Sequence, residues 1–128
     1  MIDKENCPCG SDLKYSTCCE PIIKGERKAQ SALELMKSRY SAYVKCEIDY
    51  IIQSTAASER PFYLKSDILK WAQESTWLKL EIIDFTFNTV EFKAYYRNSK
   101  GKLEIHHEFS TFIFENDSWF FFEGKGEK

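Results

Sequence analysis

Apolar residues between positions 31 and 54 recur at helical spacing. Ser31 followed three residues later by Glu34 is a capping-box pattern, which marks the start of a helix. The apolar residues that then repeat every three or four positions are Leu33, Met36, Tyr40, Tyr43 and Val44. This pattern predicts an amphipathic helix over about 31–46. A shorter run predicts a second helix over 49–54.

The segment up to Thr76 predicts one more helix. Residues 57–61 end in Pro61 and break the pattern. Ser66 is a candidate N-cap for a third helix. Its apolar surface would come from Ile68, Leu69, Trp71 and Ala72.

After Thr76 the chain changes to β-branched and aromatic runs separated by turn residues. The runs are 77–88, 89–99, 102–116 and 118–124, and the clearest turns are at 98–101 and at 116–117. Helices followed by a meander of strands indicate the α+β class. We therefore expect three helices on one face of a curved antiparallel sheet of at least four strands.

The run at 102–115 shows that neither face of this sheet is fully polar. One face carries Leu103, Ile105, His107, Phe109, Thr111 and Ile113, and the other carries Glu104, His106, Glu108, Ser110, Phe112 and Phe114. One face should meet the helices. We expect the other to meet a partner subunit, because a sheet wetted on one side alternates more cleanly. This predicts a homodimer through the sheet face.

Composition is that of a folded globular domain with a ring-rich interior. Of 128 residues, 43% are hydrophobic and 16% aromatic, and the formal net charge is −2. That balance gives no broad electrostatic reason to bind nucleic acid or an anionic membrane. No apolar run reaches membrane-spanning length, and residues 1–7 lack the apolar stretch of a signal peptide. We expect a cytoplasmic protein.

Four of the five cysteines lie within thirteen residues, at Cys7, Cys9, Cys18 and Cys19. In a reducing compartment, such a cluster favours a metal over disulfides. Four thiolates suit a closed, tetrahedral, structural Zn²⁺ site, and Tyr15 would cover the metal from water. Disulfides across the loop are the alternative, and they would need an oxidising compartment. The fifth cysteine, Cys46, reads as a buried small hydrophobe.

These residues resemble a known motif. The stretch CPCGSDLKYSTCC is similar to the SEC-C zinc knuckle, which occurs at the C-terminus of the SecA translocation ATPase and in many small bacterial proteins. Further segments resemble the YchJ family, which joins such a knuckle to a nuclear transport factor 2-like (cystatin-like) cone. They are LMKSRYSAYV at 35–44, DYII at 49–52, RP at 60–61, the run from His107 to Phe112, and SWFFFEG at 118–124.

The resemblance implies a division of the chain into a zinc-binding motif at 1–22, a linker at 23–30 and an α+β cone at 31–126. Members of the family tend to have Trp-His-Pro before the Arg-Pro turn. Here residues 54–58 read STAAS. No role of that histidine therefore carries over to this chain.

A cup between the helices and the sheet is the second candidate site. Arg39 lies at the edge of the apolar stripe of the first helix. A cationic group that is buried there needs a partner. The candidate partner is Glu108, with Ser110 beside it. The aromatic residues expected to line the same cup are Tyr40, Tyr43, Trp71 and Tyr95. Such a cup could hold a small ligand. The plainer interpretation is a structural ion pair, or an arginine whose head group reaches water.

Two functions of different classes follow from these sites. The first is a non-enzymatic binding or adaptor protein, whose cup is a scaffold or a small-ligand receptor and whose knuckle contacts another protein. The second is a small isomerase or dehydratase with a histidine, His106 or His107, near Glu108 as general base. That second hypothesis rests on fold analogy. We favour the binding protein, because no complete reaction centre is visible.

The knuckle itself gives no support for nucleic-acid binding. Residues 1–28 hold five cationic and five anionic side chains, and four thiolates with Zn²⁺ add negative charge. Tyr15 is the only aromatic residue there on which a base could stack. A protein is the expected partner. The apolar side chains expected at that contact are Leu13, Tyr15, Ile22 and Ile23. The alternative for some of them is docking onto the chain's own main domain.

Overall fold

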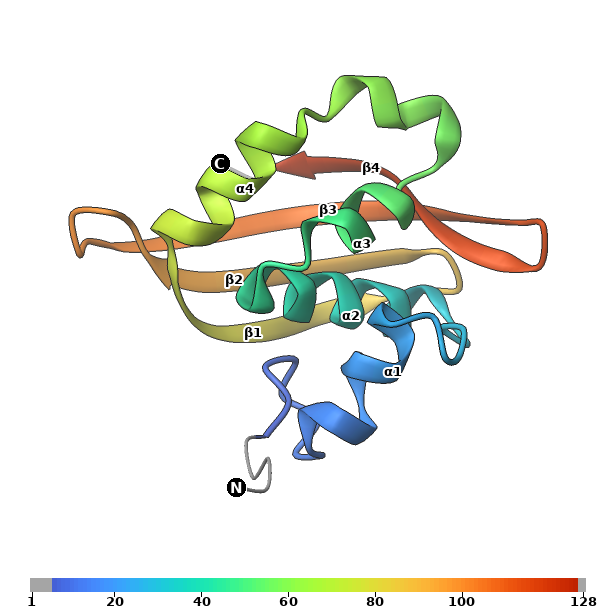
Figure 1. Cartoon of the computed structure of the whole chain (residues 1–128), viewed down its shortest axis with the longest axis horizontal. Coiled ribbons are helices and arrows are strands. Elements are labelled where there is room, and N and C mark those ends of the chain that lie inside the picture. The colour runs from blue at the N-terminus through green and yellow to red at the C-terminus, as the bar shows by residue number, and fades with distance from the viewer. Residues whose placement is uncertain (1–5, 127–128) are drawn as a thin grey trace.

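The structure, a computed structural model, describes residues 6–126 and contains one four-stranded sheet. Its strands are β1 (Thr76–Phe85), β2 (Thr89–Arg97), β3 (Leu103–Glu115) and β4 (Ser118–Gly126). They pair antiparallel in the order β1-β2-β3-β4 (Figure 1). The β3–β4 turn uses Asn116 and Asp117, both at positive φ, as a tight hairpin requires. The α+β fold expected from the sequence is confirmed.

The helices lie across one face of the sheet (Figure 1). They are α2 (Ala32–Lys45), α3 (Ile48–Gln53) and α4 (Lys65–Glu74), with a 3-10 segment at Ala57–Phe62. The Ser31 hydroxyl accepts a hydrogen bond from Glu34 N, so the predicted cap of α2 is confirmed. Ser66 does not cap α4. The helix begins one residue earlier, with Leu64 at the cap position and no side-chain capping bond.

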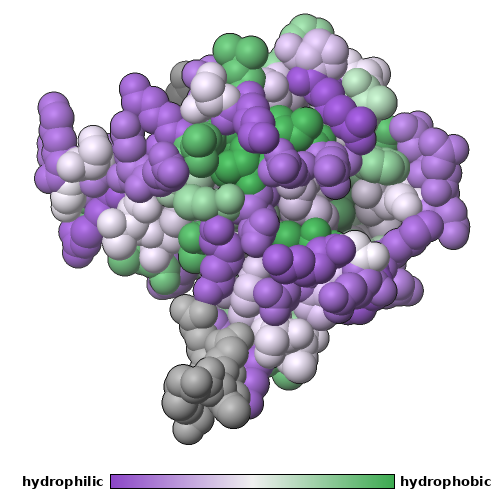
Figure 2. All heavy atoms as spheres, in the orientation of Figure 1, coloured by the Kyte–Doolittle hydropathy of each residue, from purple (hydrophilic) through white to green (hydrophobic). Residues whose placement is uncertain are grey.

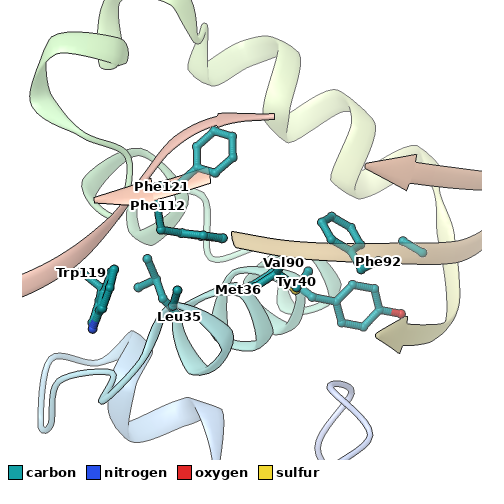
Figure 3. Close-up of a cluster of buried hydrophobic side chains, with 10 residues drawn as sticks. Leu35, Met36, Tyr40, Val90, Phe92, Phe112, Trp119 and Phe121 are labelled. Atoms are coloured by element: carbon teal, nitrogen blue, oxygen red, sulfur yellow. The ribbon is translucent and has the colours of Figure 1, made fainter. Parts of the chain in front are cut away.

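The main core lies between α2 and the sheet. Met36 and Tyr40 rise from α2 toward Val90 and Phe92 on β2 (Figure 3). The even-numbered residues of β2 face the helices, because alternate side chains of a strand point to opposite faces. The buried members of this cluster are Ala32, Leu35, Met36, Tyr40, Val90, Phe92, Ala94, Phe112, Trp119 and Phe121.

The outer face of the sheet mixes apolar and polar residues. Leu103, Ile105 and Phe109 of β3 are 40–53% exposed. Beside them, Glu91 bonds His107. The homodimer expected through this face stays a prediction. On the helix side, hydrophobic residues form separate patches among hydrophilic ones (Figure 2).

The N-terminal segment packs beside α2 (Figure 1). It holds a 3-10 turn at Tyr15–Thr17 and a short helix, α1, at Cys19–Ile23. No helix was predicted over residues 19–23. Pro21 is the third residue of α1, and proline is compatible with the first turn of a helix. Cys46 is exposed and ends α2 in the left-handed conformation, so its predicted burial is wrong.

No helix within residues 6–126 is both long enough and apolar enough to cross a bilayer.

Candidate functional sites: the cysteine cluster and the cup

The four predicted cysteines converge on one point. The sulfurs of Cys7, Cys9, Cys18 and Cys19 lie within 4.8 Å of one another. Cys9 Sγ is 3.7 Å from Cys18 Sγ, and Cys18 Sγ is 4.0 Å from Cys19 Sγ. Four sulfurs held about 2.3 Å from one zinc ion would lie about 3.8 Å apart in a tetrahedron. Disulfide-bonded sulfurs would lie only about 2.05 Å apart. All four thiols are free, so the spacing fits a shared metal.

Local backbone geometry brings the two halves of the cluster together. Cys7 N donates to Leu13 O at 2.7 Å, which closes the first loop. Gly10 and Asp12 in that loop have positive φ, which suits glycine and is tolerated by aspartate. Polar groups also surround the sulfurs: Ser11 Oγ lies 3.1 Å from Cys18 Sγ.

The cluster is also attached to the main domain. Cys7 Sγ lies 3.4 Å from Ser41 Oγ, and Ser41 is fully buried on α2. Tyr15 is buried against the thiols, as predicted, and Lys45 Nζ stands 4.7 Å from the centroid of its ring. The cysteine cluster therefore packs directly against α2.

The clustered thiols shift the pKa values of Cys7 and Cys19 in opposite directions. Hydrogen bonds from Cys19 and Cys9 lower the pKa of the Cys7 thiol. Hydrogen bonds to Cys7 and Cys9, together with burial, raise the pKa of the Cys19 thiol. Simultaneous ionisation of four thiols needs a cation that balances their charge. The donor set thus fits a soft divalent metal ion.

The second site is a cavity of about 270 Å³ between the helices and the sheet. Of the seven residues predicted for the cup, six line it: Arg39, Tyr40, Tyr43, Trp71, Glu108 and Ser110. His106 lines it as well. His106 and His107 lie on opposite faces of β3, as predicted: His106 faces the cup, and His107 lies beside Glu91 on the outer face.

The predicted ion pair between Arg39 and Glu108 is not formed. Both residues belong to the described part of the chain, and no hydrogen bond or salt bridge joins them there. Arg39 Nη1 instead donates to three neutral oxygens: Ile51 O at 2.9 Å, Ser54 Oγ at 2.7 Å and Thr55 Oγ1 at 3.2 Å. These acceptors come from the end of α3 and the two residues after it. Their availability could not be deduced without the tertiary fold.

Glu108 belongs to a separate polar cluster on β3. Its Oε1 lies 2.7 Å from His106 Nε2, and its Oε2 accepts from Ser110 Oγ at 2.5 Å. Gly124 of β4 makes room for this carboxylate, since a Cβ there would clash with Glu108 Oε2.

Comparison with known proteins identifies the architecture. The family model described as "YchJ, middle NTF2-like domain" matches residues 31–124, and the SEC-C motif matches residues 4–21. The chain belongs to the YchJ family. A UPF0225 protein of Geobacter sulfurreducens is 40% identical over 95% of this chain and 80% of its own length. A UPF0225 protein of Haemophilus influenzae is 37% identical over 94% of this chain and 77% of its own length.

Two solved structures share the fold of this YchJ-family chain. The solution structure of a SEC-C motif containing protein from Rhodopseudomonas palustris has a TM-score of 0.87 and 35% identity, over 97% of this chain and all of the other. The crystal structure of a SEC-C motif containing protein from Psychrobacter arcticus has a TM-score of 0.83 and 30% identity, covering 98% of this chain and 85% of the other. The SEC-C motif and the cysteine cluster together indicate a metal site.

Tyr95 lies outside the cup of this YchJ-family domain. It belongs to the odd-numbered set of β2, and its hydroxyl donates to Glu81 on the outer face. Its even-numbered neighbour Tyr96 lies on the helix side and contacts Trp71. Sequence reasoning missed Tyr63 and Trp77, which also line the cup. For Trp77 a signal existed, because it lies at the start of the first strand, directly after the last helix.

The Glu108 cluster predicts a pH-dependent term in the stability of this YchJ-family protein. Burial raises the pKa of Glu108, but hydrogen bonds from His106 and Ser110 and the charges of His106 and Arg39 outweigh it. The folded-state pKa therefore lies below the ordinary value of 4.5. A carboxylate with a lowered pKa stabilises the fold above its unfolded pKa and loses that contribution as pH falls through the folded value.

We expect the urea midpoint to fall more for the natural protein than for Glu108→Gln when pH drops from about 6 to about 3. Glu115→Gln, an exposed position on the same strand, is the control and should follow the natural protein. Equal pH dependence in the natural protein and Glu108→Gln would contradict this assignment.

Proposed function

We propose that this protein is a small-molecule receptor in which the cup binds the ligand and a zinc-loaded knuckle supports one wall of the cup. One observation carries the proposal: about 270 Å³ of open volume is surrounded, and not filled, by aromatic side chains. A domain that served only as a scaffold would close such a space, since protein interiors pack to high density. This volume lies slightly below about 300 Å³, the lower end of the range for ligand pockets, so we expect a small ligand.

Zinc is the metal we propose for the knuckle. Thiolates are soft ligands, and a tetrahedral set of four selects zinc or an iron–sulfur centre. A set of four thiolates within 4.8 Å of one another suits a single ion. Four protein ligands leave no open position for substrate or activated water, so the ion has a structural role.

The knuckle's apolar residues favour contact with its own chain over contact with a partner. Tyr15 and Ile22 are 6% and 4% exposed, and Ile23 packs against the interior. Only Leu13, at 55% exposed, remains available among the four residues expected to touch a partner protein. We therefore place the main contact of the knuckle on α2.

An enzyme is the second candidate, and one contact favours it. His106 and Glu108 are joined at 2.7 Å and both line the cup. A carboxylate that orients a histidine is a common arrangement for general base catalysis, as an isomerase or dehydratase needs. Replacing His106 with glutamine should then abolish turnover while ligand binding persists. A pure receptor has no turnover to lose.

The receptor proposal is tested by fragment screening with the tryptophan indole resonances in ¹H–¹⁵N spectra. Small aromatic fragments should shift the signals of Trp71 and Trp77, which line the cup, and leave Trp119 unchanged as an internal reference. Ala94→Leu, which fills the cup from β2, should remove the response. Lys93→Leu, the adjacent residue on the outer face, should retain it. No shift of Trp71 by any fragment, or equal shifts in Ala94→Leu, would contradict the proposal.

A further inference from the structure

Arg39 is the most deeply buried cation among the described residues, and part of its guanidinium is unused. The residue is 9% exposed and lines the cup. All three of its hydrogen bonds to protein leave from Nη1, toward Ile51, Ser54 and Thr55. Its guanidinium carbon stands 4.4 Å from the ring centroid of Phe121. Within residues 6–126, Nε and Nη2 have no hydrogen-bond partner.

These two nitrogens reach the open volume of the cup. Among the described residues, the one fully enclosed polar side-chain atom without a partner is Tyr15 Oη. Nε and Nη2 are therefore not sealed within protein, and the space that Arg39 borders is the cavity. Nε and Nη2 form one edge of the guanidinium, with parallel N–H groups spaced to bind both oxygens of a carboxylate.

The charge of Arg39 is also incompletely balanced. No described carboxylate forms an ion pair with it. The two carboxylate oxygens of Glu108 are hydrogen-bonded to His106 and Ser110. Burial lowers the pKa of Arg39, which is the response of a cation removed from water without a close counter-ion. The charge of Glu108 raises the pKa of Arg39, but this effect is smaller than that of burial.

The three oxygens that accept from Arg39 do not depend on it for their hydrogen bonding. The hydroxyls of Ser54 and Thr55 already donate to Ile51 O, at 3.2 Å and 2.9 Å. Without the guanidinium, the two hydroxyls would still donate to Ile51 O, and Ile51 O would still have its hydrogen bonds. A buried charge that neighbouring groups do not need is a weak contributor to stability. A ligand of opposite charge would explain its place in the cup.

We propose that the ligand of the cup is a small planar carboxylate whose oxygens accept from Nε and Nη2 of Arg39. This inference rests on the proposed receptor function and names its ligand class. The walls suit a flat, unsaturated body, since Trp71, Trp77 and Phe92 all face the cavity. A cavity of about 270 Å³ suits a ligand of a single ring.

The test compares three single-ring probes of similar size and different charge: benzoate, benzamide and benzylammonium. Each is titrated near neutral pH into the natural protein, Arg39→Met and Arg97→Met, with the Trp71 indole signal as readout. Arg97→Met removes an exposed arginine at the end of β2 and is the matched charge control. In the natural protein, benzoate should bind at least about tenfold more tightly than benzamide, as expected for a desolvated bidentate pair.

Arg39→Met should lose this preference for benzoate while its benzamide affinity and urea midpoint stay close to those of the natural protein. Arg97→Met should keep the preference. If benzoate and benzamide bind equally, or if benzoate prefers Arg39→Met, the carboxylate inference is wrong and the receptor function stands. If no aromatic fragment of any charge shifts Trp71, both are wrong. Preferential binding of benzylammonium would also overturn the inference, since it would assign the recognition to Glu108.

Discussion

Cys19→Ser is expected to lose stoichiometric zinc. Cys19 is 2% exposed, and its sulfur and those of Cys7, Cys9 and Cys18 lie within 4.8 Å of one another. Removing one of four thiolates takes away a quarter of the coordination, and serine is a poor replacement for a soft ligand. Zinc binding by small thiolate sites contributes about 10–16 kcal/mol of apparent folding free energy. The loss should therefore unfold the knuckle.

Elemental analysis gives the measurement. The natural protein should hold one zinc ion per chain and Cys19→Ser close to none. Cys46→Ser is the matched control, because Cys46 is exposed and lies outside the cluster. Equal zinc content in the natural protein and Cys19→Ser, or a loss of zinc in Cys46→Ser, would show that the cluster is not the metal site.

Hydrogen exchange should show how far the loss of zinc extends. Amides of residues 7–23 should lose protection. Amides of α2 around Ser41 should lose part of theirs, because Ser41 contacts Cys7. The strands lie beyond α2 and should stay protected.

Phe112→Ala is expected to destabilise the domain by about 3–5 kcal/mol. Phe112 is 1% exposed and packs edge-on against Phe121, with ring centroids 5.9 Å apart. It lies on the sheet under α2 and also borders the cup (Figure 3). Truncation would leave a void that surrounding residues fill only in part.

The control for this variant lies three residues away on the same strand. Phe109 faces the outer side of the sheet and is 40% exposed. Its replacement by alanine should cost no more than about 1 kcal/mol, because little area returns to water. Urea unfolding followed by circular dichroism measures both variants. Similar losses for Phe112→Ala and Phe109→Ala would contradict the assignment of the two faces.

Local patterns in the sequence predicted α2, the turns of the sheet and the cysteine cluster. Each depends on residues close together in the chain: the cap of Ser31 on Glu34, the turn at Asn116 and Asp117, and the spacing of the thiols. For such features, sequence spacing largely determines spatial proximity.

Features that depend on contacts across the fold were predicted less well. Tyr95 was assigned to the cup, but a shift of one position along a strand moves a side chain to the opposite face. The alternation of Val90 and Phe92 into the core could have corrected this. For Arg39 a carboxylate partner was expected, and the fold supplied neutral oxygens from the end of α3. No local pattern marks those oxygens as acceptors.

The most direct test of the receptor proposal is a crystal structure of the zinc-loaded protein soaked with benzoate. We predict an open cup with the ring of benzoate between Trp71 and Phe92 and its carboxylate on Nε and Nη2 of Arg39. A cup closed by its own side chains, with Tyr43 or Trp71 turned into the space and no room for ligand or water, would contradict the account.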